Sequence, residues 1–343
     1  MKALVLRAAN TPFVLEDVPD PVAGPGEAVA RVIACGSGLT IQHIKAGRNP
    51  TQFPRIIGHE ITGEIVEVGS GVAGLAVGDP VTCYFYLNCG HCRWCRTDRE
   101  TLCENLQGTI GRVIDGGYAE FMKLPARNFI KLPGGLDYRN HPAEVGVIAD
   151  ALATPLKVIR RGRIKPSDTV AVFGAGGGLG IHMLMMAKWA HARAIAVDIR
   201  PEKFAACRSA GADAAVDGSR NDLQEALLDL TGGHGVDVAI DFVGTEATLR
   251  SAFDALGRGG RLVSLAGEGG LRLPSSPLRR KEIDILGSLY CTRQEVIETL
   301  DLVARGQVWP MVTEIGSMAD AEAIHERVAQ GLVIGRAALR IAP

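Results

Sequence analysis

Residues 169–180 read Thr-Val-Ala-Val-Phe-Gly-Ala-Gly-Gly-Gly-Leu-Gly, an apolar run followed by a glycine-rich turn. The run Thr169–Phe173 predicts a buried β-strand, and Gly180–Ala190 predicts a helix that begins directly after the turn. Because glycines have no side chains, the backbone can approach a pyrophosphate, and the helix N-terminus stabilises its charge. The stretch therefore predicts a dinucleotide site. Its residues are Gly174, Gly177, Gly178, Leu179 and Gly180.

An acidic residue further along the chain strengthens this prediction, which would be weak on the glycines alone. The strict G-x-G-x-x-G spacing is not met, because it would have to begin at Ala175. However, a second strand, Ala194–Val197, is followed by Asp198, 18 residues beyond Gly180. A carboxylate there accepts hydrogen bonds from ribose hydroxyls and repels a 2′-phosphate, an effect that a mobile Arg200 does not cancel. We therefore predict NAD rather than NADP.

The pattern of predicted strands and helices changes at about residue 151. Before it, short β-rich segments alternate with Gly- and Pro-containing turns, as in an antiparallel β domain. After it, strand-like and helical segments alternate, which is typical of βαβ units on a parallel sheet. The expected strands are Ala28–Ile33, Gly63–Val68, Pro80–Phe85, Val236–Phe242, Arg261–Leu265 and Ala337–Ile341. The expected helices are Pro201–Ser209, Ala247–Leu256, Arg293–Ala304 and Ala319–Gln330.

Charge and hydropathy exclude several classes of function. The 343 residues carry a formal net charge of −1, so nothing favours nucleic acid or an anionic membrane as a partner. No apolar stretch reaches the roughly 20 residues that a membrane span needs. The N-terminal apolar run is short and interrupted by Arg7, unlike a signal peptide. We expect a cytoplasmic protein that acts on a small molecule.

Four of the eight cysteines lie within 15 residues. Their pattern is C-x2-C-x2-C-x7-C, and thiolates at such short spacing are typical zinc ligands. A site with four protein ligands has no open position for a substrate, so its role is structural. The predicted ligands of this structural zinc are Cys89, Cys92, Cys95 and Cys103.

These motifs resemble those of the zinc-containing medium-chain alcohol dehydrogenases, in order and over nearly the whole chain. Besides the cysteine loop and the glycine turn, the similar segments are Gly58-His59-Glu60, Gly78-Asp79, Val197-Asp198-Ile199, Gly235-Val236-Asp237 and Gly335-Arg336. The resemblance implies an α/β protein with a β-rich GroES-like catalytic domain, residues 1–150 and 288–343. A doubly wound (Rossmann) nucleotide domain, residues 151–287, is inserted into it.

The resemblance also implies hydride transfer between NAD(P) and an alcohol, aldehyde or ketone, usually in a homodimer or homotetramer. By the same resemblance, Lys203 helps to hold the adenosine ribose, Arg336 contacts the pyrophosphate and Thr154 lies near the nicotinamide. In this chemistry a zinc ion polarises the alcohol oxygen. The proton then leaves through a hydroxyl, the ribose and a histidine, for which the matching residues are Thr40 and His43.

The catalytic metal ligands depart from the family pattern. The segment A-C-G-x-C-x-[ST]-D-x-H has Gly38 in place of the ligand cysteine and Ile41 in place of the aspartate, while Cys35 matches the cysteine that is not a ligand. His59, Glu60 and Asp150 remain as candidate catalytic residues. Carboxylates do bind zinc, so these three residues could form a weak site. The same losses would also suit a degenerate site without metal.

The sequence is compatible with three hypotheses for the function. The first is an NAD-dependent alcohol dehydrogenase with an atypical catalytic metal site. The second is a metal-independent NAD(P)H reductase of an activated C=C bond or another electrophile, which would tolerate Gly38. The third is a nucleotide-binding or structural protein of the same fold without catalysis. Thr40 and His43 argue against the third, because neither helps to bind phosphates.

Overall fold

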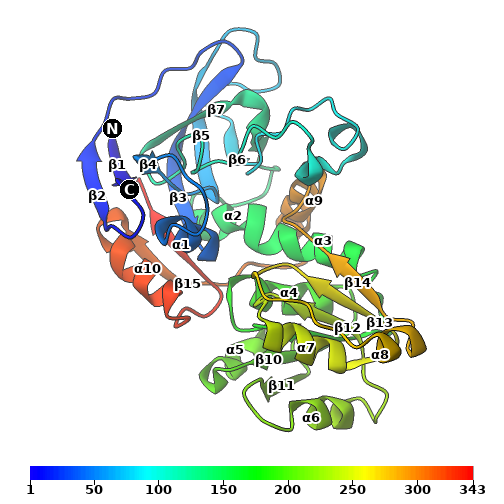
Figure 1. Cartoon of the computed structure of the whole chain (residues 1–343). Coiled ribbons are helices and arrows are strands. Elements are labelled where there is room, and N and C mark those ends of the chain that lie inside the picture. The colour runs from blue at the N-terminus through cyan, green and yellow to red at the C-terminus, as the bar shows by residue number, and fades with distance from the viewer. Residues whose placement is uncertain (343) are drawn as a thin grey trace. The chain divides into compact units, whose positions relative to one another are not determined.

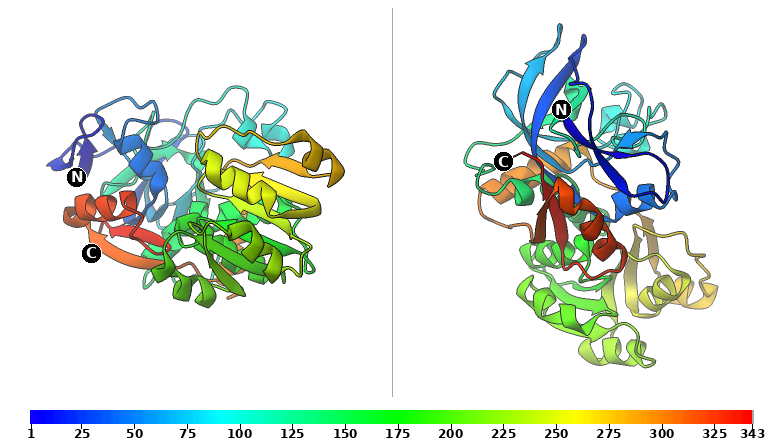
Figure 2. Two further views of the ribbon diagram at one scale, coloured as in Figure 1. Left: turned by 60° about the horizontal axis from the view of Figure 1, so that its bottom comes forward. Right: turned by 90° about the vertical axis from the view of Figure 1, so that its left-hand side faces the viewer.

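The computed structural model describes residues 1–342 and divides into two compact units. The first unit consists of Met1–Ala151 and the C-terminal segment from Thr292, and the second is Leu152–Cys291. Both ends of the described chain belong to the first unit, where they are marked in Figure 2. No helix within residues 1–342 is long and apolar enough to cross a membrane.

The first unit contains a seven-stranded sheet with β3 at its centre (Figure 1). The strands run β15-β16-β3-β5-β6-β8, and β7 pairs with β3 as well. They are β3 (Glu27–Ser37), β5 (Ile61–Val68), β6 (Pro80–Cys83), β7 (Phe121–Pro125), β8 (Phe129–Lys131), β15 (Val312–Ser317) and β16 (Arg336–Arg340). A smaller sheet contains β1 (Lys2–Leu6), β2 (Phe13–Asp17) and β4 (Arg55–Ile56). The helices of this unit are α1 (Leu39–Lys45), α2 (Pro142–Val147), α9 (Arg293–Ala304) and α10 (Ala321–Ala329).

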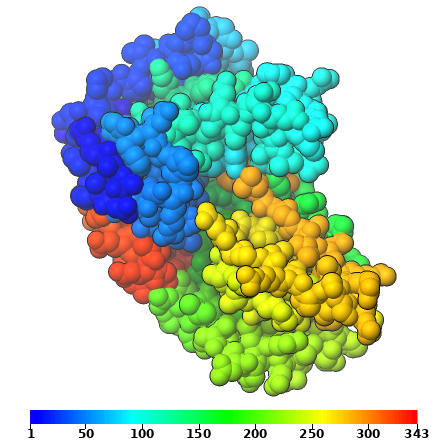
Figure 3. Space-filling model, viewed as in Figure 1, coloured from blue at the N-terminus to red at the C-terminus, as the bar shows by residue number. Residues whose placement is uncertain are grey.

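Strand β3 joins the two ends of the chain in this sheet. It is antiparallel to β16, and Ser37 and Gly36 lie opposite Ala337 and Ala338. This pairing extends β3 beyond the expected end at Ile33. The space-filling view shows N-terminal residues in blue beside C-terminal residues in red on one face (Figure 3). An ion pair between Lys45 and Glu322 also joins these two parts of the chain. The pairing with β16 therefore sets where β3 ends and where the following loop begins.

The second unit is built on a six-stranded parallel sheet, in the order β11-β10-β9-β12-β13-β14. The chain starts at β9, moves outward through β10 and β11, and then returns to the other side at β12, which is the doubly wound arrangement. Its strands are β9 (Thr169–Phe173), β10 (Arg193–Asp198), β11 (Ala214–Asp217), β12 (Val236–Asp241), β13 (Leu256–Ser264) and β14 (Asp284–Gly287). Its helices are α3 (Ala153–Arg161), α4 (Gly178–Trp189), α5 (Phe204–Ser209), α6 (Leu223–Leu230), α7 (Glu246–Asp254) and α8 (Ser275–Arg280).

Local differences from the predicted elements have physical causes. The expected helix over 201–209 begins as a 3-10 turn, Pro201–Lys203, before α5. Strand β13 begins at Leu256, five residues earlier than expected, because Leu256 pairs with Val236 across an irregular register. A π-helical turn, Ile148–Leu152, lies between α2 and α3 and was not predicted. Such turns are frequent at functional sites, and this one carries Asp150.

Candidate functional site

The glycine turn lies between β9 and α4 and has little room for side chains. Gly174 has φ 75°, a conformation that glycine adopts without strain. A Cβ atom on Gly180 would lie only 2.1 Å from the carbonyl oxygen of Gly174. Helix α4 therefore begins close against the strand, with Gly177, Gly178 and Leu179 only half-buried at its start. The turn fits a dinucleotide, because it leaves backbone amides at a helix N-terminus for a pyrophosphate.

Asp198 lies at the end of β10 and contacts this turn. Its carboxylate accepts hydrogen bonds from the amides of Gly176, at 2.8 Å, and Arg200, at 3.1 Å. The Lys203 ammonium donates to the carbonyl oxygen of Gly176 at 3.4 Å, and burial lowers the pKa of Lys203. Asp198 and Lys203 therefore both contact Gly176, a residue of the turn that was not among those predicted from the sequence. The run of three consecutive glycines at 176–178 was the available signal. Thr154 is buried on α3 of the same unit.

The four predicted cysteine ligands form one cluster, near the 3-10 turns Cys95–Thr97 and Glu100–Leu102. Four thiolates at about 2.3 Å from a tetrahedral zinc ion stand about 3.8 Å apart. The Sγ atoms of Cys89 and Cys95 are 3.9 Å apart, those of Cys92 and Cys95 3.5 Å, and those of Cys92 and Cys103 4.0 Å. The cluster therefore fits a closed zinc site.

Backbone amides donate hydrogen bonds to sulfur atoms of this cluster. The amide of Cys89 donates to the Sγ atom of Cys103 at 3.3 Å, and the amide of Cys92 donates to that of Cys89 at 3.4 Å. Hydrogen bonds from the backbone of His91 and Cys92 lower the pKa of Cys89 to about 6. Burial raises the pKa of Cys95 to about 12, and the adjacent thiols contribute. A cation bound at the centre of the cluster would favour the thiolate form of all four cysteines.

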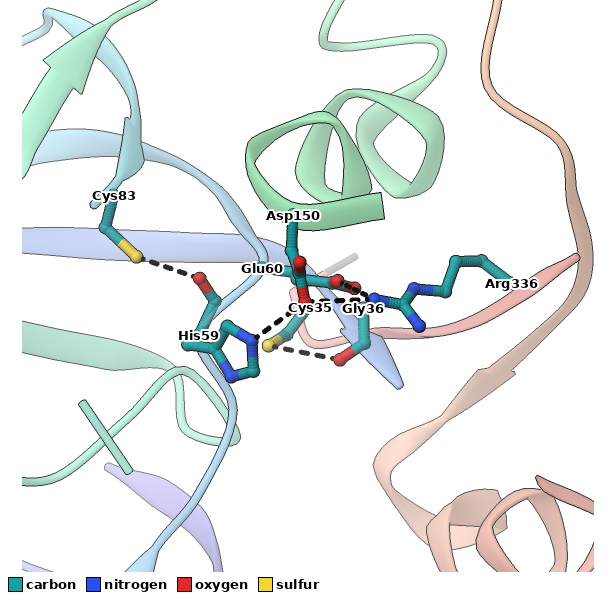
Figure 4. Close-up of polar contacts among 7 residues, drawn as sticks. All are labelled: Cys35, Gly36, His59, Glu60, Cys83, Asp150 and Arg336. Carbon is teal, nitrogen blue, oxygen red and sulfur yellow. Dashed lines mark hydrogen bonds and ion pairs between the residues drawn. The ribbon is translucent and has the colours of Figure 1, made fainter. Parts of the chain in front are cut away.

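A second cluster contains His59, Glu60 and Asp150, all buried (Figure 4). His59 and Glu60 directly precede β5, and Asp150 projects from the π-helical turn. The Nε2 atom of His59 lies 3.5 Å from the Oδ2 atom of Asp150, and the ring of Phe85 packs 4.2 Å from the His59 ring. One donor atom from each of the three residues lies within 4.8 Å of the others. The sequence prediction grouped these three residues, and the fold brings them together.

Arg336 also belongs to this cluster, although the resemblance assigned it to the pyrophosphate. It is buried at the start of β16, and its Nη2 atom donates to Glu60 and, at 3.1 Å, to Asp150 (Figure 4). Burial raises the pKa of Glu60 to about 7, opposed by the Arg336 charge and assisted by the Asp150 charge. Two of the three candidate metal ligands are therefore engaged by a cationic side chain.

Gly38 explains how the guanidinium fits. A Cβ atom on Gly38 would lie 2.5 Å from the Nη1 atom and 2.7 Å from the Cζ atom of Arg336. Because Gly38 has no side chain, the guanidinium of Arg336 occupies the space that a side chain at position 38 would fill. The cluster supplies three donors, lacks a ligand at position 38 and already contains a cation. In this arrangement it does not fit a zinc ion.

The neighbouring cysteines do not replace the missing ligand. Cys83 donates through its thiol to the carbonyl oxygen of His59 at 3.1 Å, and burial raises its pKa to about 12. Burial also raises the pKa of Cys35 well above its usual value, and its thiol points to the Gly36 carbonyl oxygen at 3.7 Å. Both are therefore neutral thiols near neutral pH, and neither offers a thiolate.

Thr40 and His43 lie on α1, which begins directly after Gly38. They are three residues apart, so they lie on the same side of this short helix. Both are half-buried.

Comparisons with known proteins cover the whole chain. Residues 24–134 match the family model described as alcohol dehydrogenase GroES-like domain, and residues 178–305 match the model described as zinc-binding dehydrogenase. An alcohol dehydrogenase of Geobacillus stearothermophilus is 35% identical over 99% of both chains. An NAD-dependent alcohol dehydrogenase of Sulfolobus acidocaldarius is 31% identical over 99% of this chain and 100% of its own.

Solved structures agree with these matches. The alcohol dehydrogenase of Aeropyrum pernix superposes with a TM-score of 0.91 at 35% identity, covering 99% of this chain and 100% of its own. The predicted fold, a GroES-like β domain with a doubly wound parallel sheet, is confirmed by the domain models and this likeness. The prediction of an enzyme of the alcohol dehydrogenase type is confirmed as well. This chain belongs to the zinc-containing medium-chain alcohol dehydrogenase family.

Proposed function

We propose that this chain interconverts an alcohol and an aldehyde or ketone, with NAD as the hydride acceptor. The observation that carries the proposal is the contact between Asp198 and the glycine turn, at 2.8 Å from its carboxylate to the Gly176 amide. A carboxylate at this point suits the ribose hydroxyls of NAD and opposes the extra phosphate of NADP. The relatives that are named NAD-dependent alcohol dehydrogenases support the same activity.

The residues of the chain have separate tasks in this proposal. The glycine turn and the start of α4 hold the pyrophosphate, while Asp198 and Lys203 orient the adenosine ribose. Thr154 keeps the nicotinamide role that the resemblance gives it, whereas Arg336, which donates to Glu60 and Asp150, is given no contact with the pyrophosphate. A bound NAD would supply the acceptor for the hydride of the alcohol carbon. Thr40 and His43 carry the hydroxyl proton toward solvent, as general acid–base groups.

A zinc ion in such a centre would polarise the substrate oxygen. The weak zinc site suggested for His59, Glu60 and Asp150 requires that the Arg336 guanidinium first leave the two carboxylates. We therefore assign no step of the reaction to a metal.

The engagement of Arg336 also favours a second candidate function. A reductase of an activated C=C bond needs a hydride and a proton but no metal ion, so a guanidinium in the centre is compatible with it. This candidate predicts consumption of NADH with enals or enones and a saturated product. The first candidate predicts formation of NADH from an alcohol and the reverse reaction with the matching carbonyl compound.

The test is an assay of NADH absorbance across primary and secondary alcohols, aldehydes, ketones and enals, with product analysis by mass spectrometry. Gly180→Ala serves to show that the activity belongs to this chain, because the added Cβ would lie 2.1 Å from the Gly174 carbonyl oxygen. Gly287→Ala is its matched control in the same unit, since a Cβ there meets no atom within 4 Å. We expect turnover of at least one alcohol, lost in the first variant and kept in the second. Reduction of C=C bonds alone would overturn the first candidate.

A further inference from the structure

The buried cluster at Glu60 and Asp150 concentrates negative charge. Glu60 is 1% exposed and Asp150 is 6% exposed. Carboxylates removed from water to this extent require a cation or several hydrogen bonds. Within the described chain the cationic group bonded to both is Arg336, itself 6% exposed. Its Nη2 atom lies between the two carboxylates, where an ion that they shared would lie.

The absence of a side chain at Gly38 is not required by its backbone. Gly38 has φ −127° and ψ 179°, an extended conformation that any residue adopts. What opposes a side chain there is Arg336, whose guanidinium atoms would lie 2.5–3.1 Å from the added Cβ. Glycine at position 38 and arginine at position 336 are thus complementary in shape.

Strand pairing fixes this complementarity. Ser37 pairs with Ala337 and Gly36 pairs with Ala338 in the antiparallel register of β3 and β16. Gly38 and Arg336 are the residues that directly adjoin the pair Ser37 and Ala337, so the strand pairing brings them near each other. The guanidinium is therefore delivered to the cluster by the main sheet rather than by a surface loop.

A divalent ion and this guanidinium exclude each other. An ion bound to carboxylates lies about 2.0–2.2 Å from their oxygens, which is the space that Nη2 occupies. Two cations at that separation in a buried site repel strongly. Occupation of the cluster by a metal therefore requires the side chain of Arg336 to move away.

We propose that Arg336 is the resident cation of this centre, in the space left by Gly38, and that it excludes a catalytic metal ion from His59, Glu60 and Asp150. The proposal goes beyond the function above, because it states which cation the centre holds. It requires no turnover and does not depend on the substrate. It predicts one zinc ion per chain, at the four-cysteine cluster.

Cobalt is the probe, because its absorption spectrum distinguishes four thiolate ligands from nitrogen and oxygen ligands. Full-length protein is loaded with Co²⁺ or Zn²⁺, passed over a mild chelating resin and analysed for metal content. Wild type should retain one ion with a four-thiolate spectrum. Arg336→Met should bind a second, weaker ion with a nitrogen–oxygen spectrum. Arg336→Lys, which keeps the charge, should retain one.

Adding a cysteine tests the space directly. Gly38→Cys combined with Arg336→Met should hold the second ion through the chelating step and add a thiolate band to the cobalt spectrum. Wild type that retains two ions would overturn the proposal. So would an Arg336→Met protein that has the circular dichroism spectrum of the wild type and still takes up one ion. Since metal content is counted without substrate, an inactive protein with the expected counts would refute only the proposed function.

Arg336→Met leaves two buried carboxylates without their partner and can fail to fold. A double-mutant cycle with Gly38→Ala keeps the proposal testable in that case. Gly38→Ala should lower the unfolding temperature, because the added methyl group collides with the Arg336 guanidinium. Adding Arg336→Lys should recover part of that loss, because the lysine side chain is narrower. Additive effects of the two substitutions would show that residues 38 and 336 do not share this space, and would overturn the proposal.

Discussion

Asp198 shows how one side chain serves both the fold and the choice of cofactor. Its carboxylate accepts hydrogen bonds from two backbone amides, those of Gly176 and Arg200. Asp198→Gly removes the hydrogen bonds between the Asp198 carboxylate and the ribose hydroxyls. Hydrogen bonds to a charged group contribute about 1.5–3 kcal/mol. The ratio of kcat/KM for NAD over NADP should therefore fall about 10-fold to 150-fold. Steady-state kinetics with both cofactors measures this ratio.

A matched control for this prediction lies on the neighbouring strand. Asp217 ends β11 and pairs in register with Asp198, but its carboxylate contacts Ser219 instead of the glycine turn. Asp217→Gly should leave the cofactor ratio unchanged. Equal turnover of NAD and NADP by the unmodified protein would contradict the assignment of Asp198.

His325 gives a prediction about pH. It is buried on α10, its Nε2 atom lies 2.8 Å from the Tyr118 hydroxyl, and burial lowers its pKa to about 3, assisted by the charge of Lys45. The unfolded chain takes up this proton near pH 6.5, whereas the folded chain does so only near pH 3. Stability from this group is therefore fully present above pH 6.5 and is lost as the pH falls toward 3.

At pH 5 this difference amounts to about 2 kcal/mol of unfolding free energy. His325→Gln should lose about that much less stability than wild type between pH 7.5 and pH 5. Urea unfolding of both proteins at the two pH values measures the effect, and acid effects on the cysteine cluster cancel in the comparison. Parallel losses in the two proteins would refute this account of His325.

Among the elements, the segment that carries the four-cysteine cluster has the clearest consequence for stability. Cys95→Ser removes one of four soft ligands, and structural zinc sites contribute roughly 10–16 kcal/mol of folding free energy in small zinc proteins. Loss of even part of this free energy should lower the unfolding temperature by several degrees, because each kcal/mol of stability corresponds to about 2–4 °C. Zinc content should fall together with it, as measured by elemental analysis and calorimetry.

Cys207→Ser is the control for this variant. Cys207 is fully buried in the second unit, whereas the four-cysteine cluster belongs to the first. Its replacement should lower stability by loss of packing but leave the zinc content unchanged. If Cys95→Ser kept its full zinc content and stability, the closed zinc site would be wrong.

The elements also show which features a sequence can predict. Strand β9 and helix α9 have the predicted limits, Thr169–Phe173 and Arg293–Ala304, because hydrophobic periodicity and the Thr292 cap act locally. Strand β3 runs beyond its predicted end, because its partner β16 lies some 300 residues away. The π-helical turn at 148–152 has no local pattern that marks it.

The candidate site divides in the same way. The residues near the nucleotide turn and the cysteine cluster follow from short-range spacing. Sequence reasoning also identified Gly38 as a lost ligand, but it did not predict what would fill the space. The contact of Arg336 with Glu60 and Asp150 depends on strand register and on the exact shape of the buried cluster. Neither can be derived from residue types alone.

At the scale of the whole molecule, each unit has its own buried core. In the second unit the core includes Phe173, Ile195, Val197 and Phe253, whereas the cysteine cluster belongs to the first unit. Removal of the structural zinc should therefore affect the two units unequally. Hydrogen-exchange mass spectrometry of zinc-depleted protein should show lost protection around residues 80–131 and retained protection in β9, β10 and β12. Equal loss in both units would contradict this expectation.

The position of Arg336 near the C-terminus has a consequence for biosynthesis. Gly38 and Arg336 are 298 residues apart, and ribosomes add about 5–20 residues per second. The nascent chain thus spends roughly 15–60 s with β3 lacking its β16 neighbour and with Glu60 lacking its guanidinium. The second unit, complete at Cys291, can fold during this interval. The first unit must wait for β16, so the newly made protein acquires its buried cation only after Arg336 has been synthesised.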